Sequence, residues 1–362
     1  MRSKTASESA LEEIGTTTGK EILVTFVVPC YNASAYMDNC ILSILQGSAN
    51  HQQHIEIIIV DDGSDADDTA VKADDWQNKY PTIIRAYHQS NGGHGEAVNT
   101  GLKHARGMYF KVVDADDWLD EKSLPVVLNH LLLLSLSGLD LFITNYVYEK
   151  PGIGKRKLIR FNNVMEEARI LGWDDIGNFK PQQNLVMHAV IYRTELLRMS
   201  NLVLPAHTFY VDNIFVYVPL PYVQTIYYLN CDLYRYFIGR DNQSVNEQTM
   251  VKRVDQQLFI TRIMIDAYRL NEEIQNKVLR DYMTHYLTMM MTICVVFLRL
   301  SKAQDAEKQR IDLWIYLKEK DPKSYLQIRG ALLSLLTNIP GKPGKWVCLK
   351  GYRFARSIFK FN

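Results

Sequence analysis

The sequence lacks long apolar runs, paired cysteines and a marked excess of charge of either sign. No apolar stretch reaches the roughly 20 residues that a transmembrane helix needs. Five dispersed cysteines, none in a C-x-x-C pair, argue against a disulfide framework or a zinc site and favour a reducing cytoplasm. Residues 1–20 are polar, so we expect a flexible tail there and no signal peptide.

The formal net charge is only +1 over 362 residues. Proteins that bind nucleic acid need a basic surface to neutralise phosphates, so the overall charge gives no support for a nucleic-acid partner. The chain is too long for one small core, and 47% of its residues are apolar. We therefore expect one large α/β domain with a smaller addition.

Short β-branched and aromatic runs alternate with segments of helical periodicity over the first 145 residues. This alternation predicts a mostly parallel, Rossmann-like sheet that is covered on both faces. The predicted strands are 22–28, 55–60, 83–87, 108–113 and 139–144. In such sheets ligands bind beyond the carboxyl ends of the strands. The residues expected at that edge are 29–32, 61–64 and 114–117.

Three carboxylates, Asp114, Asp116 and Asp117, follow the fourth predicted strand. Clustered carboxylates repel one another, and burying them is unfavourable unless a cation compensates. Oxygen ligands of this kind favour Mg²⁺ or Mn²⁺, which usually also bind substrate phosphates. The alternative is an acidic turn in which Asp117 caps the next helix.

Asp61 and Asp62 end the second predicted strand, and Tyr31 follows the first. One of these carboxylates is placed to accept a hydrogen bond from a nucleotide base or ribose, and the tyrosine ring to stack on a base. The alternatives are a simple turn and a loop aromatic that covers the end of the sheet.

Four motifs in this order and spacing resemble those of the family 2 glycosyltransferases, which have a GT-A fold and invert the anomeric centre. The motifs are V-V-P-C-Y-N (27–32), V-D-D-G-S-D (60–65), S-N-G-G-H-G-E-A-V-N-T-G (90–101) and V-D-A-D-D-W (113–118). The resemblance covers roughly residues 22–245.

The resemblance implies roles for the residues at the strand ends. Pro29, Tyr31 and Asp62 would hold a uracil-type base and its ribose. Asp114 and Asp116 would form the D-x-D pair, with Asp116 nearest a bound Mn²⁺ or Mg²⁺. Asp117 is an alternative or additional metal ligand, because the cluster offers more than one register.

Asn32, Gly93 and His94 belong to the same motifs and are expected to line the donor site. The family often has an Arg-Asn pair after its glycine-rich segment, whereas this chain has Val98 and Asn99. His94 or Lys103 would then supply the positive charge that faces the diphosphate, with a solvated Lys103 as the favoured alternative for the lysine.

The resemblance also implies that Asp212, at the start of an aromatic helix, is the catalytic base. An inverting transfer needs one carboxylate to take the proton from the acceptor hydroxyl. The family commonly has a second acid where this chain has Asn213. The alternative for Asp212 is a helix N-cap.

Arg240 lies in a loop that is suited to closing over the diphosphate, because an arginine fork matches phosphate geometry. The alternative is a surface turn. His188 has an apolar sequence context, which favours a core histidine over one that lines an acceptor pocket.

Beyond residue 245 the pattern changes to long amphipathic helices, predicted over 246–340, with a basic, aromatic segment at 341–362. In that segment Phe354, Ile358 and Phe361 share one predicted helix face and the cations another, as in helices that lie on anionic lipid. The alternative is packing against its own domain or a second subunit, and a homodimer fits the helical region too.

These features predict a metal-dependent hexosyltransferase, with a GT-A domain at 21–245 and a helical C-terminal extension. It would transfer a sugar from a nucleotide-sugar, with UDP as the favoured carrier, to a glycan or lipid-linked acceptor. We expect a cytoplasmic location, peripheral to the inner face of the membrane, and a role in surface polysaccharide or glycolipid synthesis. The alternatives are a nucleotidyltransferase, disfavoured because residues 29–32 contain neither Gly nor Lys, and a non-catalytic sugar-binding relative.

Overall fold

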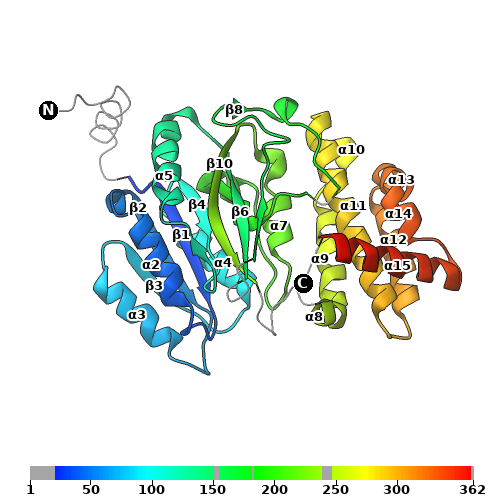
Figure 1. The fold of residues 1–362 in the computed structure, drawn as a ribbon, viewed down its shortest axis with the longest axis horizontal. Coiled ribbons are helices and arrows are strands. Elements are labelled where there is room, and N and C mark those ends of the chain that lie inside the picture. The colour runs from blue at the N-terminus through cyan, green and yellow to red at the C-terminus, as the bar shows by residue number, and fades with distance from the viewer. Residues whose placement is uncertain (1–20, 151–154, 182, 239–246, 360–362) are drawn as a thin grey trace. The chain divides into compact units, whose positions relative to one another are not determined.

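The computed structural model describes residues 21–150, 155–181, 183–238 and 247–359. They form two compact units. The first contains the described residues of 21–177, 185–208 and 222–238, and the second those of 178–184, 209–221 and 239–362. Two short segments from within the predicted 21–245 domain therefore belong to the second, helical unit. In Figure 1 the first unit is mainly the blue-to-green part of the ribbon.

The first unit is built on one sheet with the strand order β3-β2-β1-β4-β9-β6-β10-β5. The strands are β1 (Val24–Cys30), β2 (Ile55–Asp61), β3 (Ile84–His88), β4 (Tyr109–Val112), β5 (Trp118–Leu119), β6 (Leu141–Lys150), β7 (Lys155–Ile159), β8 (Ile170–Leu171), β9 (Val190–Arg193) and β10 (Ile226–Phe237). Strands β1 to β4 are parallel. Strand β9 is antiparallel to both β4 and β6, so β6 and β10 run in the direction of β4.

This arrangement confirms the predicted mostly parallel α/β sheet. Every residue of β1, β2 and β4 is buried. A strand that is buried on both faces favours a continuous run of β-branched and aromatic side chains, and that run is the pattern that predicted these strands. Strand β9, which is antiparallel to its neighbours, was not predicted.

Helices follow most strands of this unit. They are α2 (Met37–Gly47), α3 (Thr69–Lys79), α4 (His94–His104), α5 (Ser123–Leu134) and α6 (Thr194–Met199), with short 3₁₀ turns that include η4 (Met187–Ala189). Helix α4 packs on β1 and β2. A Cβ atom on Gly101 of α4 would lie 2.3 Å from Val27 Cγ1, so only glycine permits this close approach of helix and strand.

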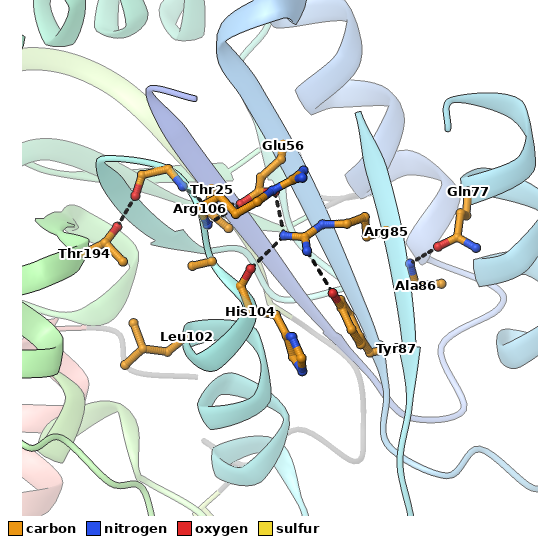
Figure 2. A network of polar contacts seen from close by, with 12 residues as sticks. Thr25, Glu56, Gln77, Arg85, Ala86, Tyr87, Leu102, His104, Arg106 and Thr194 are labelled. Atoms are coloured by element: carbon orange, nitrogen blue, oxygen red, sulfur yellow. Dashed lines mark hydrogen bonds and ion pairs between the residues drawn. The ribbon is translucent and has the colours of Figure 1, made fainter. Parts of the chain in front are cut away.

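A buried glutamate joins the amino ends of the first strands (Figure 2). Glu56 of β2 accepts hydrogen bonds from the Thr25 hydroxyl (2.6 Å) and from the Arg106 backbone N–H (2.6 Å). The Arg85 and Arg106 guanidinium groups lie 2.7 and 2.8 Å from its other oxygen. Arg85 also donates to the His104 carbonyl at the end of α4. These bonds tie β1, β2, β3 and α4 together at one edge of the sheet.

The second unit is helical, as predicted. Its helices are α7 (Asp212–Tyr217), α8 (Glu247–Lys252), α9 (Val254–Ala267), α10 (Leu270–Glu273), α11 (Lys277–Leu300), α12 (Ala306–Lys320), α13 (Pro322–Gly330), α14 (Leu332–Thr337) and α15 (Gly341–Phe359). Helix α11 is long and apolar enough to cross a membrane by length and composition alone. However, 61% of its most apolar 18-residue stretch is buried. It packs against α9, α12, α13, α14 and α15. It forms the core of this unit.

The Pro-Gly-rich segment 340–344 lies where two helices meet. Helix α14 ends at Thr337, and the last helix, α15, begins at Gly341. Proline is compatible with the first turn of a helix, because the N–H groups of that turn have no partner within the helix. Pro343 therefore lies in the opening turn of α15.

Candidate functional site

The carboxyl ends of β1, β2 and β4 lie at the same edge of the sheet, because these strands are parallel and adjacent. Tyr31 follows β1, Asp62 follows β2, and Asp114 comes two residues after the end of β4. Pro29 is part of β1 and pairs in register with Val60 of β2. The sheet thus gathers the three predicted strand-end motifs at one edge of the first unit.

Asp62 holds the glycine-rich segment against the sheet. Its carboxylate accepts hydrogen bonds from the backbone N–H groups of Gly92 (2.8 Å) and Gly93 (2.7 Å). The Gln89 side-chain amide donates to it as well, at 2.7 Å. The side chain is only 2% exposed. Both of its oxygens therefore have protein donors in this structure, and Asp62 fixes the loop that precedes α4.

Gly93 is required in that loop by its backbone conformation. Its φ of +84° lies in the left-handed region, and an added Cβ would lie 3.0 Å from the His207 backbone nitrogen. His207 donates its N–H to the Gly92 carbonyl at 2.6 Å. The segment is thus held from both sides, by Asp62 and by His207, directly before the first turn of α4.

Asn32 connects the first two motifs through hydrogen bonds. Its side-chain oxygen accepts hydrogen bonds from the backbone N–H groups of Asp65 (3.1 Å) and Ala66 (3.0 Å). Its own N–H donates to the Ser64 hydroxyl at 2.9 Å. Tyr31, next to it, is half exposed. The loops after β1 and β2 are therefore fastened together, and the Tyr31 ring faces solvent.

Asp114 lies between two histidines. Its oxygens are 2.8 Å from Nε2 of His94, at the start of α4, and 3.4 Å from Nε2 of His188, in η4. Burial by itself would raise the pKa of Asp114, but the charges and hydrogen bonds of His94 and His188 outweigh burial and hold this pKa well below its usual range. Of Asp114 and Asp117, these contacts therefore favour the ionised form of Asp114.

Asp117 is held in place by hydrogen bonds from two residues of β10. Its two oxygens accept hydrogen bonds from the Tyr234 hydroxyl (2.7 Å) and the Phe237 backbone N–H (2.7 Å). It is 1% exposed. Burial, together with the neighbouring charge of Asp114, raises the pKa of Asp117 well above its usual range. The two carboxylates thus share a buried site that favours a negative charge on only one of them at a time.

His188 is the functional candidate that the sequence placed in the core. Its ring lies 4.7 and 4.6 Å, between centroids, from the rings of Tyr234 and Tyr236 on β10. The fully buried Lys111 of β4 donates to the Met187, His188 and Val190 carbonyls, and so fixes the η4 turn that carries His188. Burial lowers the pKa of Lys111 to about 7. No local sequence signal distinguishes His188, because its partners come from distant strands.

Asp114, Asp117 and His188 form a candidate metal site. One potential ligand atom from each lies within 4.8 Å of the others. Carboxylate oxygens with an imidazole nitrogen fit Mn²⁺ or Mg²⁺, with Mn²⁺ tolerating the imidazole better. A cation would also relieve the repulsion between the two acids. Asp116 is partly exposed and lies in the same loop, but outside this group of three.

Two further predicted residues lie outside the described part of the first unit. Asp212 belongs to the second unit, where it is the first residue of α7 and Val211 stands at the N-cap position. Tyr210, two residues earlier, has a φ of +66°. Such conformations are uncommon for a bulky residue and often occur at functional sites. Arg240 lies outside the described residues.

Comparisons with known proteins find glycosyltransferases. Residues 25–194 match the glycosyl transferase family 2. The glycosyltransferase EpsJ of Bacillus subtilis, itself uncharacterized, is 42% identical over 97 residues, which are 27% of this chain and 27% of EpsJ. The shared stretch is thus little more than a quarter of that relative's length.

Solved structures agree on the fold. TarS 1-349 of S. aureus in complex with UDP has a TM-score of 0.63 at 16% identity, over 92% of each chain. A mannosyltransferase of Pyrobaculum calidifontis in complex with GDP-Man and Mn²⁺ has a TM-score of 0.53 at 16% identity, over 98% of this chain and 94% of that one. These likenesses confirm the predicted GT-A type of α/β fold with its helical C-terminal region.

Proposed function

Because residues 25–194 match the family 2 glycosyltransferases, we propose that the protein transfers a hexose from a nucleotide-diphosphate sugar to an acceptor hydroxyl. The observation that carries the proposal is the cluster Asp114, Asp117 and His188 at the carboxyl edge of the sheet. The UDP complex of TarS supports UDP as the carrier. The anomeric centre of the sugar would be inverted in one displacement.

The donor would lie along the ends of β1, β2 and β4. In this proposal the half-exposed Tyr31 ring stacks on the base, with Pro29 beneath it. Asp62 acts on the nucleotide indirectly, by holding Gly92 and Gly93 in place, and the lack of a side chain at the partly exposed Gly93 leaves room for the diphosphate. His94, which is partly exposed beside Asp114, would face the diphosphate from the start of α4, where the helix dipole favours anions. Arg240 would contribute a second cation.

The donor set of the acidic loop suits a divalent cation, as described above, and we assign this role to Mn²⁺ or Mg²⁺. When bound, the cation would neutralise the charge of the departing nucleoside diphosphate. Asp116, partly exposed in the same loop, would be one of its protein ligands, with Asp114 and Asp117 close by. Asp117 would also fix the loop, through its bonds to Tyr234 and Phe237.

Asp212 is our proposed base, which would take the proton from the acceptor hydroxyl as the bond to the sugar forms. Its segment is firmly held within the second unit. The Phe209 N–H donates to Gln256 at 2.8 Å, and the Arg253 guanidinium lies 3.6 Å from the Phe209 ring centroid. Asn213, where the family commonly has a second acid, accepts a hydrogen bond from Tyr286. Rigid support of this kind is what a base needs for correct orientation.

The acceptor in this proposal is a glycan or a lipid-linked sugar that is being built into a surface polysaccharide or glycolipid. Transfer to a growing polymer chain at a membrane would need an enzyme that is peripheral to that membrane.

The first experiment is a screen of UDP-, GDP- and dTDP-sugars, with and without Mn²⁺, for thermal stabilisation and for hydrolysis of the donor. We expect one UDP-sugar to stabilise the protein and Mn²⁺ to strengthen the effect. If no nucleotide-sugar or nucleoside diphosphate binds with either cation, the proposed function is wrong.

Two matched variants separate the proposed roles. Asp212→Asn should abolish transfer while UDP binding is retained, because the base acts only on the acceptor. Asp116→Asn should weaken the Mn²⁺-dependent part of UDP binding. Loss of UDP binding in Asp212→Asn would contradict its assignment as the base.

A further inference from the structure

Helix α14 of the second unit is oriented with its polar side chains inward. Its two polar residues, Ser334 and Thr337, are buried. Its four leucines are exposed, Leu332 by 73% of its surface, with Leu333, Leu335 and Leu336 between 43% and 49%. Exposing four leucines on one short helix is unfavourable in water. An apolar partner that covers these leucines would remove the unfavourable contact with water.

This orientation is fixed by specific hydrogen bonds. The buried Asn338 accepts from the Trp314 indole N–H (2.7 Å) and from Arg310 (2.8 Å), and donates to the Ser334 carbonyl (2.8 Å). Arg299 donates to the Ile339 carbonyl at 2.8 Å. These bonds hold the residues that directly follow α14 against α11 and α12, so its leucines cannot turn inward without breaking them.

Helix α15 packs beside α14 and exposes a further large apolar side chain. It buries Cys348 and exposes Trp346 by 63%. Lys350 lies 5.7 Å from the centroid of the Trp346 ring, and Lys345 beside it is exposed. A tryptophan flanked by lysines is typical of side chains at the level of lipid headgroups.

The charge of this region supports the same partner. Residues 322–362 contain eight Lys and Arg residues and no Asp or Glu, although the whole chain has a net charge of only +1. Each cation near an anionic membrane surface favours binding. Two copies of this face would bring their positive charges together in a symmetric dimer, so charge disfavours self-association.

We propose that α14 and the Trp346 side of α15 form a docking surface for an anionic lipid bilayer. The four leucines and Trp346 would enter the boundary between headgroups and acyl chains, while Lys345 and Lys350 contact the headgroups. This places the principal apolar contact on α14, and not only on the basic segment 342–362. The inference does not depend on the proposed glycosyl transfer.

The test is co-sedimentation of the full chain with vesicles of phosphatidylcholine, with and without about one third phosphatidylglycerol. We expect binding to the anionic vesicles, weakened by salt. Leu332→Ser with Leu336→Ser should weaken binding by about tenfold or more, and Lys345→Glu with Lys350→Glu by a similar factor. The matched control is Ile311→Ser with Ile315→Ser on α12, where the two side chains are 46% and 48% exposed. It should bind like the unaltered chain.

A second measurement does not depend on the stability of the leucine variants. Vesicles with brominated acyl chains should quench the tryptophan fluorescence of the unaltered chain, and Trp346→Phe should remove most of that quenching. The proposal is overturned if the unaltered chain binds neither kind of vesicle, or if the leucine and α12 variants bind equally well. A dimer that dissociates in the leucine variant, without vesicle binding, would assign the face to a second copy instead.

Discussion

The parallel sheet has a buried acidic site at each of its two edges, and the two sites differ in how their charge is balanced. At the amino edge, Glu56 is surrounded by two arginines and two further donors (Figure 2). At the carboxyl edge, Asp114 and Asp117 lie together with histidines and a tyrosine hydroxyl, and no arginine or lysine forms an ion pair with either among the described residues. The first site has two arginines to balance its charge, whereas the second has histidines and, in the proposed function, gains a divalent cation.

This contrast separates stability from function. A buried carboxylate with matched cations adds to the stability of the fold, whereas buried carboxylates that repel each other reduce stability and are retained for binding or catalysis. Changing the two sites should therefore have opposite consequences.

The largest effect is expected from Asp114→Asn. Removing this charge should lower kcat/KM for the donor identified in the screen by about a hundredfold or more, because electrostatic contacts at the reacting groups contribute on this scale. The free energy of unfolding should change by less than about 1 kcal/mol, since the repulsion with Asp117 is removed as well. Steady-state kinetics and urea unfolding measure the two quantities. If Asp114→Asn lost stability but kept its activity, the carboxyl-edge site would serve stability rather than function, contrary to our interpretation.

The second largest effect is expected at Glu56, where stability should fall and activity should be retained. Glu56→Gln should lower the free energy of unfolding by about 2–3 kcal/mol, because Arg85 and Arg106 lose their counter-charge but both keep some access to water. The kcat/KM of the folded protein should stay within about twofold. Glu195→Gln is the matched control. Glu195 and Arg198 form an exposed pair 3.7 Å apart on α6, and such pairs contribute about 0.5 kcal/mol or less.

The pH dependence of stability should show whether the charge of Glu56 is responsible for this loss of stability. Burial by itself would raise the pKa of Glu56, but hydrogen bonds from Thr25 and Arg106 and the charge of Arg85 outweigh it and lower the pKa below 4.5. A depressed pKa means that the stabilisation is fully present above about pH 4.5 and is lost as the pH falls through the folded-state pKa. The difference in unfolding free energy between the unaltered protein and Glu56→Gln should therefore shrink from pH 7 to pH 4. A constant difference would show that the charge of Glu56 is not responsible.

The carboxyl edge was largely predictable from the sequence, and the amino edge was not. Buried strands end in recognisable runs, so the residues after β1, β2 and β4 could be placed at one edge from their order alone. Glu56 gave no such signal. It sits inside an apolar strand, and its partners Arg85 and Arg106 come from segments 29 and 50 residues away.

The same limit applies within the candidate site. The acidic loop was found because three carboxylates are consecutive or nearly so in the sequence. His188 was assigned to the core, because its proximity to Asp114 arises only when η4 is fixed beside β4 by Lys111. Asp62 was identified as a site residue, but its bonds to Gly92 and Gly93 depend on the left-handed turn at Gly93, which the pattern alone does not specify.

The smallest effect is expected from Thr194, an uncharged residue in the chain of hydrogen bonds that leads to Glu56 at the amino edge of the sheet. The buried Thr194 hydroxyl donates to the Gly107 carbonyl, and the Gly107 N–H donates to the Thr25 hydroxyl, which in turn donates to Glu56. Thr194→Val keeps the shape of the side chain but removes one neutral donor, so unfolding should become easier by about 1 kcal/mol, with activity unchanged. Thr194→Ser retains the hydroxyl and should lose less. If Thr194→Val were as damaging as Glu56→Gln, hydrogen bonding along the network, rather than the balance of charge at Glu56, would hold this edge of the sheet together.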